Sequence, residues 1–122
     1  MHYRHQEAKD RLKFENAPVA FELTAGSVTL AKGSGFLRLK EGDYPVVAYI
    51  SQDCVDKTRL VKSPTKTACP FKGEASYYSL IGDNGEILVE DIAWSYEKPI
   101  EEAMALKGHL AFYPHKAVLT EN

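Results

Sequence analysis

The chain has few cysteines and no metal-ligand pattern, and these absences exclude several classes of site. Two cysteines cannot supply a four-thiolate zinc site, and the four histidines show no zinc-binding spacing. We therefore expect no metal and no cofactor. In a reducing compartment, two cysteines are expected to be free thiols.

The chain also lacks a charge excess and a long apolar run. Fifteen Lys and Arg residues nearly balance seventeen Asp and Glu residues, which leaves a net charge of -2. Such a balance produces no field that would draw nucleic acid or an anionic membrane. No apolar stretch approaches the roughly 18 residues of a membrane helix, and residues 1–7 carry no signal-peptide segment. We expect a cytoplasmic protein with no nucleic-acid partner and no membrane partner.

A chain of 122 residues suffices for one domain that buries its own core. Residues 1–17 are polar and charged, and we expect a loosely held arm or a short amphipathic helix there. Residues 18–122 are expected to form a single, mainly β domain.

Short runs rich in β-branched and aromatic residues fill the first half of this domain. They predict antiparallel strands over 19–24, 27–31, 36–40 and 46–51. The run 46–50 has no polar member, as expected for a strand covered on both faces. The Gly33-Ser34-Gly35 break lacks the ending of a phosphate loop and predicts a hairpin turn. The polar residues 53–67 are interpreted as a solvated connection.

The Asn84-Gly85 pair is the strongest local signal, because a type I′ turn needs positive φ at both central positions. That turn would pair Ile81 with Leu88, Ser79 with Glu90, Tyr77 with Ile92, and Ala75 with Trp94. Side chains alternate along strands, so one face would carry Tyr77, Trp94 and Tyr96, and we expect it to be core. The opposite face would carry Lys72, Glu74, Tyr78 and Asp91. That face is either the solvated side of a sheet or a cleft in which Glu74, Tyr78 and Asp91 converge.

Residues 99–107 predict the one helix, with Pro99 at its first position, glutamates near its amino end and Gly108 after its last turn. Residues 109–113 and 117–120 predict a closing pair of strands.

Several of these segments resemble a bacterial family, domain of unknown function 427, which is also labelled nucleotidyltransferase-like. The resemblance covers roughly residues 19–119 and rests on Cys69-Pro70-Phe71-Lys72-Gly73, Ala75-Ser76-Tyr77-Tyr78-Ser79, Ala93-Trp94-Ser95-Tyr96, Pro99 and Phe112-Tyr113. It implies strongly twisted antiparallel sheets in a β-tent-like open barrel, with one short helix near 99–107. It supplies no function. The chain departs from the family pattern at Cys54, where an Asp usually precedes the valine.

Two side chains in the 69–73 segment carry reactive chemistry. Cys69 could be a nucleophile, but a thiol needs a nearby cation or helix terminus to lower its pKa, and the sequence places no histidine beside it. Lys72 could pair with Glu74 or orient a ligand. The alternative is that Cys69 is a small residue that fixes the loop.

Three functions remain open at this point. The preferred one is a small-molecule binding module whose site includes Lys72, Glu74, Tyr77, Tyr78, Asp91, Trp94 and Tyr96. The second is a small hydrolase or transferase that uses Cys69 or Lys72 as a catalytic residue. The third is an interaction scaffold or homodimer in which the motif residues serve folding alone.

Overall fold

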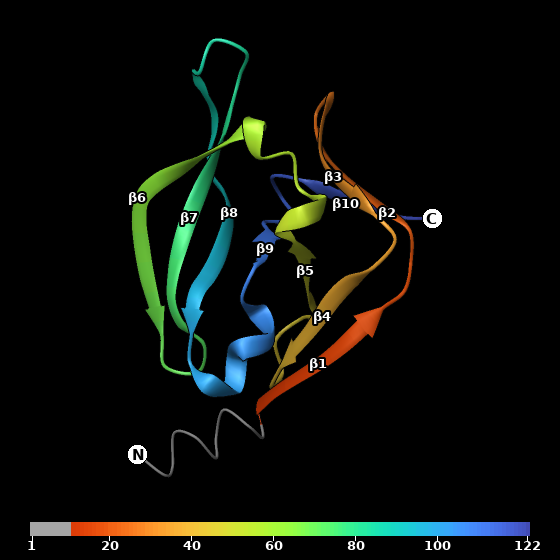
Figure 1. The fold of residues 1–122 in the computed structure, drawn as a ribbon, viewed down its shortest axis with the longest axis vertical. Coiled ribbons are helices and arrows are strands. Elements are labelled where there is room, and N and C mark those ends of the chain that lie inside the picture. The colour runs from red at the N-terminus through yellow and green to blue at the C-terminus, as the bar shows by residue number, and fades with distance from the viewer. Residues whose placement is uncertain (1–10) are drawn as a thin grey trace.

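The computed structural model describes residues 11–122, which form two antiparallel sheets. The larger sheet has the strand order β1-β4-β5-β9-β8-β7-β6, and the smaller has the order β10-β2-β3. Within the described residues the two sheets do not close into a barrel. In Figure 1 the strands β6, β7 and β8 form one side of a strongly curved sheet, and β4 and β1 form the other.

The strands of the first half follow the predicted pattern closely. They are β2 (Phe21–Ala25), β3 (Val28–Gly33), β4 (Phe36–Glu41) and β5 (Val47–Ser51). The second half contains β6 (Leu60–Cys69), β7 (Gly73–Ile81), β8 (Ile87–Pro99), β9 (His109–Phe112) and β10 (Val118–Glu121).

β5 is covered on both faces in its second half, whereas Val46, at the start of the predicted run, is 54% exposed. Tyr49 and Ile50, each 1% exposed, belong to two different core clusters. The first core lies between the sheets and includes Phe21, Leu30 and Phe112. The second core lies on the other face of β5 and packs against the 3-10 segment η3 (Glu101–Leu106).

Two expected segments have a different structure. Residues 12–17, placed in the arm by sequence, form the edge strand β1 (Leu12–Ala17), which pairs with β4 and buries Leu12 and Ala17. The rest of the predicted arm, residues 1–10, lies outside the described residues. Residues 53–67 are not a simple solvated connection, because they contain η1 (Gln52–Cys54), η2 (Lys57–Arg59) and most of β6. Their polarity reflects the edge position of β6, where Lys side chains and a proline are tolerated.

The predicted helix at 99–107 is also wrong in type. Pro99 ends β8, and residues 101–106 form two 3-10 turns interrupted at Ala103, where φ is −111° and ψ is 15°. The segment is short and is fixed by burial of Ala103 and Leu106 in the second core, which outweighs its helix propensity.

The Gly33-Ser34-Gly35 break is not a hairpin, because β3 and β4 belong to different sheets. A Cβ on Gly33 would lie 2.8 Å from the Cys54 sulfur and 3.1 Å from the Phe21 ring. The glycine is therefore required by close packing where the chain passes from one sheet to the other.

Candidate functional site

The turn between β7 and β8 sets the register of the site, and it is not the predicted type I′ turn. The amide of Gly85 donates to the Gly82 carbonyl over 3.0 Å, and the amide of Gly82 donates to the Glu86 carbonyl over 2.8 Å. Gly85 has a φ of 81°, whereas Asn84 does not have positive φ. The loop is thus one residue longer, with a single left-handed glycine, a common alternative for hairpins.

The register of β7 and β8 differs from the prediction along most of its length. Leu80 pairs with Val89 as predicted, but Tyr77 pairs with Trp94 rather than with Ile92. Three register shifts interrupt the pairing, between Glu74 and Ser76, between Tyr78 and Leu80, and between Leu80 and Ile81. Bulges of this kind cannot be deduced from alternation alone. Their effect is to place Tyr77 and Trp94 opposite each other.

Three more aromatic side chains gather around this pair, and we call the five together the aromatic cluster: Tyr49, Tyr77, Trp94, Tyr96 and Tyr113. The Trp94 indole nitrogen donates to the Tyr49 hydroxyl over 3.3 Å, and the two rings meet edge to face with centroids 6.4 Å apart. The Trp94 and Tyr113 ring centroids are 4.6 Å apart. Tyr113 is hydrogen-bonded to Tyr77, whose hydroxyl lies 2.9 Å from Thr67 Oγ1. The structure thus brings together three predicted site residues, Tyr77, Trp94 and Tyr96, and adds Tyr49 and Tyr113.

Three tyrosines of the cluster, Tyr49, Tyr96 and Tyr113, are held in their neutral form. Burial raises the pKa of Tyr49 and of Tyr96 well above the usual value for a phenol. Burial, together with the hydrogen bond to Tyr77, raises the pKa of Tyr113 to about 12. These hydroxyls therefore serve as uncharged hydrogen-bonding groups and the rings as contact surface, rather than as anionic nucleophiles.

Trp94 also lines an apolar groove of about 400 Å³ to which both sheets contribute. The lining side chains are all apolar and include Leu23 of β2, Ala48 of β5, Phe112 of β9 and Val118 of β10. β5 pairs with β9 only from Tyr49 onward, and the preceding Val47 and Ala48 line the groove. Two valines at the groove, Val46 and Val118, are 54% and 60% exposed.

The sequence suggested an ion pair between Lys72 and Glu74, but the structure does not contain it. The Lys72 ammonium group forms an ion pair with Glu41 at the end of β4, and the two side chains are only 12% and 14% exposed. Arg11 shares Glu41 at 3.4 Å, and Lys72 Nζ lies 5.7 Å from the centre of the Tyr96 ring. Glu74 instead lies 3.6 Å from Lys66 on β6. The pairing with Glu41 joins residues 31 positions apart, which a local pattern could not reveal.

Cys69 is a free, half-buried thiol at the end of β6, where it packs against the second core. The Lys72 amide donates to the Cys69 carbonyl over 3.2 Å, which closes the Cys-Pro-Phe-Lys turn. Within residues 11–122, no hydrogen bond joins Cys69 to a histidine. His109 Nδ1 lies 3.1 Å from the Lys107 carbonyl, and the His115 ring packs at a tilt against Tyr113 with centroids 5.5 Å apart.

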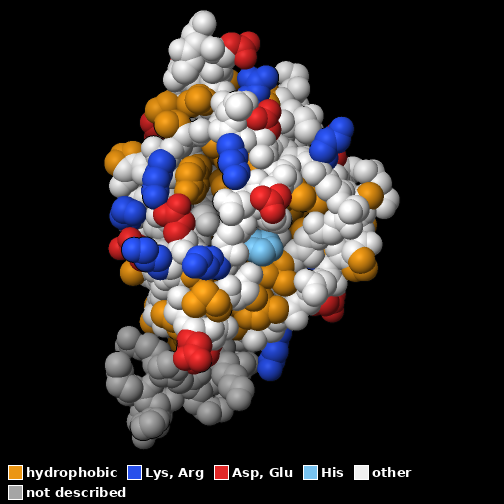
Figure 2. Space-filling model, in the orientation of Figure 1, with side chains coloured by type: hydrophobic (Ala, Val, Ile, Leu, Met, Phe, Trp, Pro, Cys, Tyr) orange, Lys and Arg blue, Asp and Glu red, His pale blue; other side chains and the backbone are white. Residues whose placement is uncertain are grey.

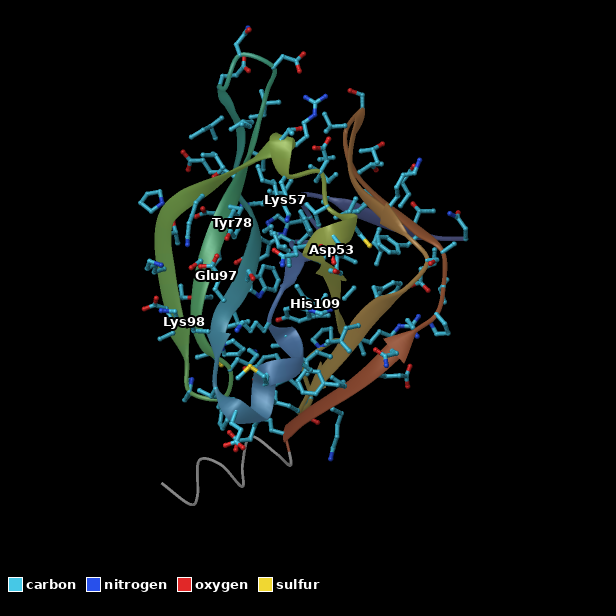
Figure 3. The ribbon with its side chains drawn as sticks, viewed as in Figure 1. Asp53, Lys57, Tyr78, Glu97, Lys98 and His109 are labelled. Atoms are coloured by element: carbon cyan, nitrogen blue, oxygen red, sulfur yellow. The ribbon has the colours of Figure 1, made fainter. Side chains whose placement is uncertain are left out.

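Glu74, Tyr78 and Asp91 do not converge, because each has a different partner. The Tyr78 hydroxyl donates to Glu97 Oε2 over 2.6 Å, whereas Asp91 Oδ2 accepts from Thr65 Oγ1 over 2.7 Å. Figure 3 shows Tyr78 and Glu97 side by side on the sheet formed by β6, β7 and β8. The predicted cleft on this face is therefore not formed by these three residues.

Glu97 organises a polar network that sequence reasoning missed. Its Oε1 accepts from Lys62 over 2.7 Å and from Ser76 over 3.0 Å. These donors, with Tyr78, lower the pKa of Glu97 to about 2, while burial and the bond to Glu97 raise the pKa of Tyr78 to about 12. Figure 2 shows this face, where Lys and Arg side chains mix with Asp and Glu. The network needed β6 beside β7, and β6 was not predicted.

Among residues 11–122, no three His, Cys, Asp or Glu side chains are grouped in a way that could hold a metal ion. In the same part of the chain, no helix has the length and apolar character to cross a membrane.

The comparisons with known proteins agree with the motifs. Residues 13–121 match the family described as Domain of unknown function (DUF427). The chain belongs to this family, which confirms the resemblance seen in the sequence. No curated protein matches the chain.

Proposed function

We propose that the domain binds a small, uncharged molecule with a planar ring in the groove beside Trp94. The observation that carries the proposal is the groove itself: about 400 Å³, with a lining that contains no charged side chain. That volume lies within the roughly 300–1,000 Å³ typical of ligand pockets. The curved sheet and the smaller sheet on one of its faces support a β-tent arrangement as the scaffold for this site.

The aromatic cluster gives the groove one rigid wall. Trp94 is hydrogen-bonded to Tyr49 and packs against the tilted ring of Tyr113, so its indole ring is fixed from two directions. A fixed aromatic ring offers contact area to a ligand ring with little loss of side-chain entropy. The Trp94 nitrogen is already paired with Tyr49, so the part of Trp94 that lines the groove is available for apolar contact.

The predicted roles of the other residues follow from this placement. Tyr77 and Tyr96 support the wall, and Lys72 lies beside Tyr96, held by Glu41. Glu74 and Tyr78 belong to ion pairs and hydrogen bonds outside the groove lining. Catalysis by Cys69 or Lys72 is less well supported, because the Lys72 ammonium is engaged by Glu41 and no hydrogen bond joins Cys69 to a histidine among the described residues.

The test uses N-phenyl-1-naphthylamine, an uncharged aromatic probe whose absorption overlaps tryptophan emission. Because Trp94 is the one tryptophan in the chain, energy transfer to the probe reports on the groove directly. We expect saturable energy transfer and a rise in Tm with the wild-type protein. Ala48→Phe, which fills the groove, should abolish both, whereas Ala105→Phe, at an exposed position of η3, should not.

Val118→Lys provides a second variant that does not depend on core packing, since this side chain is 60% exposed. A charge at the groove should weaken binding of the apolar probe. Absence of saturable transfer in the wild-type protein, or equal transfer in all three variants, would overturn the proposal.

The exposed valines favour one further candidate, a homodimer that covers the same groove. Val46 and Val118 flank it, and β10 is the last strand of its sheet. Exposed apolar side chains on an unpaired strand edge favour association. In this case the protein should be a dimer by light scattering at micromolar concentration, Val118→Lys should be monomeric, and the wild-type protein should not bind the probe. A monomeric wild-type protein would exclude the homodimer.

A further inference from the structure

A backbone irregularity in β8 lies three residues before Trp94. Asp91 has a φ of 46°, and it is the one non-glycine residue with positive φ within residues 11–122. Such a conformation is strained and persists only where the surroundings enforce it. Asp and Asn tolerate it better than other residues, because their short side chains can hydrogen-bond locally.

Asp91 lies in the middle of a large β-bulge. Leu80 pairs with Val89 and Tyr78 pairs with Ala93, so residues 90–92 of β8 lie opposite Ser79 alone. The bulge therefore inserts two extra residues into β8. Because a strand rises about 3.3 Å per residue, it displaces the following part of β8 by about 7 Å along β7.

Hydrogen bonds to three other segments hold the bulge in place. The Asp91 amide donates to Ser79 Oγ over 3.0 Å, and Thr65 Oγ1 reaches from β6 to Asp91 Oδ2 over 2.7 Å. Lys116 Nζ donates to the carbonyl oxygens of Glu90 and Asp91, over 2.9 Å and 3.2 Å. These contacts replace the ladder bonds that the bulge removes, and they require the Asp91 carboxylate and backbone in their present positions.

One feature of Asp91 is unfavourable for stability alone. Its Oδ1 is buried and has no hydrogen-bond partner among the described residues. A buried polar atom without a hydrogen-bond partner generally destabilises the folded state. Backbone strain and an unpaired carboxylate oxygen at one residue indicate that this segment is shaped for a purpose other than stability.

The bulge determines where Trp94 lies. Without the two inserted residues, Trp94 would lie opposite Ala75; with them it lies opposite Tyr77. The same segment places Tyr113, whose amide donates to the Ile92 carbonyl over 3.1 Å and whose ring packs on Trp94. We propose that Asp91 is a positioning residue for ligand binding, and that its bulge places the indole ring of Trp94 in the groove to contact a ring-bearing ligand.

This inference rests on the proposed function, but its test has a readout that does not need a ligand. Acrylamide quenching and the emission maximum of the single tryptophan measure how Trp94 is seated. In Asp91→Ala, acrylamide should quench the Trp94 fluorescence more efficiently, and the emission maximum should lie at longer wavelength. The variant should bind N-phenyl-1-naphthylamine about tenfold more weakly. Asp91→Asn should restore wild-type values, because Asn keeps an oxygen for Thr65 and tolerates positive φ. Asp83→Ala, with a side chain 89% exposed in the wild type, is the matched control and should change neither readout.

Thr65→Val keeps the shape of β6 and removes only the bond to Asp91 Oδ2, so it serves if Asp91→Ala fails to fold. In this variant acrylamide should quench the Trp94 fluorescence more efficiently than in the wild type, and probe binding should be about threefold weaker. The inference would be overturned if folded Asp91→Ala, or Thr65→Val, had the same tryptophan quenching and probe affinity as the wild type. It would also be overturned if Asp91→Asn did not have wild-type quenching and affinity. If the wild-type protein does not bind the probe, the proposed function fails, and the quenching data still decide whether Asp91 positions Trp94.

Discussion

The indole nitrogen of Trp94 donates a hydrogen bond to the hydroxyl of Tyr49 over 3.3 Å, across 45 residues of sequence. Tyr49 is on β5 and Trp94 on β8, and β9 lies between them in the sheet. The bond therefore fixes Trp94 to the opposite side of the curved sheet.

Tyr49→Phe tests that bond while keeping the buried ring. The Trp94 N–H loses its partner, so we expect a loss of about 1 kcal/mol in the free energy of unfolding, measured with urea. Tyr44→Phe removes a hydroxyl from a side chain that is 62% exposed and should leave stability unchanged. Equal stability of the two variants would contradict the role assigned to the bond.

Glu97 should make stability fall in acid. Its ordinary pKa of 4.5 is lowered to about 2 in the folded protein, first by Lys62 and then by Tyr78. Since the unfolded chain binds the proton more tightly, the contribution is fully present above the unfolded value and is lost as the pH falls from about 4.5 towards about 2. The side chain is 43% exposed, so solvent screening limits the effect to about 1 kcal/mol.

The corresponding measurement compares wild type with Glu97→Gln by urea unfolding near neutral pH and in acid. The variant should lose less stability on acidification, and Glu101→Gln, at an exposed position of η3, should behave as wild type. An unchanged acid dependence in Glu97→Gln would show that the network does not hold this carboxylate ionised.

Gly33→Ala should destabilise the fold because its Cβ would meet the Cys54 sulfur at 2.8 Å. Overpacking of this kind typically costs about 1–3 kcal/mol, visible as a lower Tm. Gly35→Ala is the matched control, since its Cβ would meet the Ala17 carbonyl oxygen at an ordinary 3.5 Å. Cys54→Ala removes the clashing sulfur, so the double variant should recover part of the loss. If the Tm changes of Gly33→Ala and Cys54→Ala are simply additive in the double variant, the clash between a Cβ at position 33 and the Cys54 sulfur is contradicted.

Lys72→Met should leave the Glu41 carboxylate without its main partner. Both side chains are largely buried, but Arg11 remains 3.4 Å from Glu41, so we expect a loss of about 1–3 kcal/mol. Lys72→Met combined with Glu41→Met should be more stable than Lys72→Met alone, and the double-mutant cycle gives the coupling. Exposed Lys13→Met is the control. A coupling near zero would show that the pair contributes little beyond packing.

Much of the fold could be predicted because local patterns carry it. The alternation around β2 to β5 and the motifs of β7 and β8 identify strands whose side chains must be buried on one or both faces. The grouping of Tyr77, Trp94 and Tyr96 on one face also followed, because the bulge between Leu80 and Tyr78 adds two residues and so preserves the alternation. The same residues could not reveal Tyr49 or Tyr113 as their neighbours, since those contacts come from β5 and from the segment after β9.

The amino-acid sequence by itself determined the family, the mainly β class and the apolar identity of the strands, because composition, periodicity and motif spacing act over short distances. Only the tertiary structure decided the register of β7 and β8, the partner of Lys72 and the groove at Trp94. Each of these depends on which distant segments meet: a three-residue turn and a bulge at Asp91, the end of β4 against the Cys-Pro-Phe-Lys turn, and side chains of both sheets around the groove. Burial and hydrogen bonding between distant segments therefore outweighed the local preferences of Asn84-Gly85 and of residues 99–107.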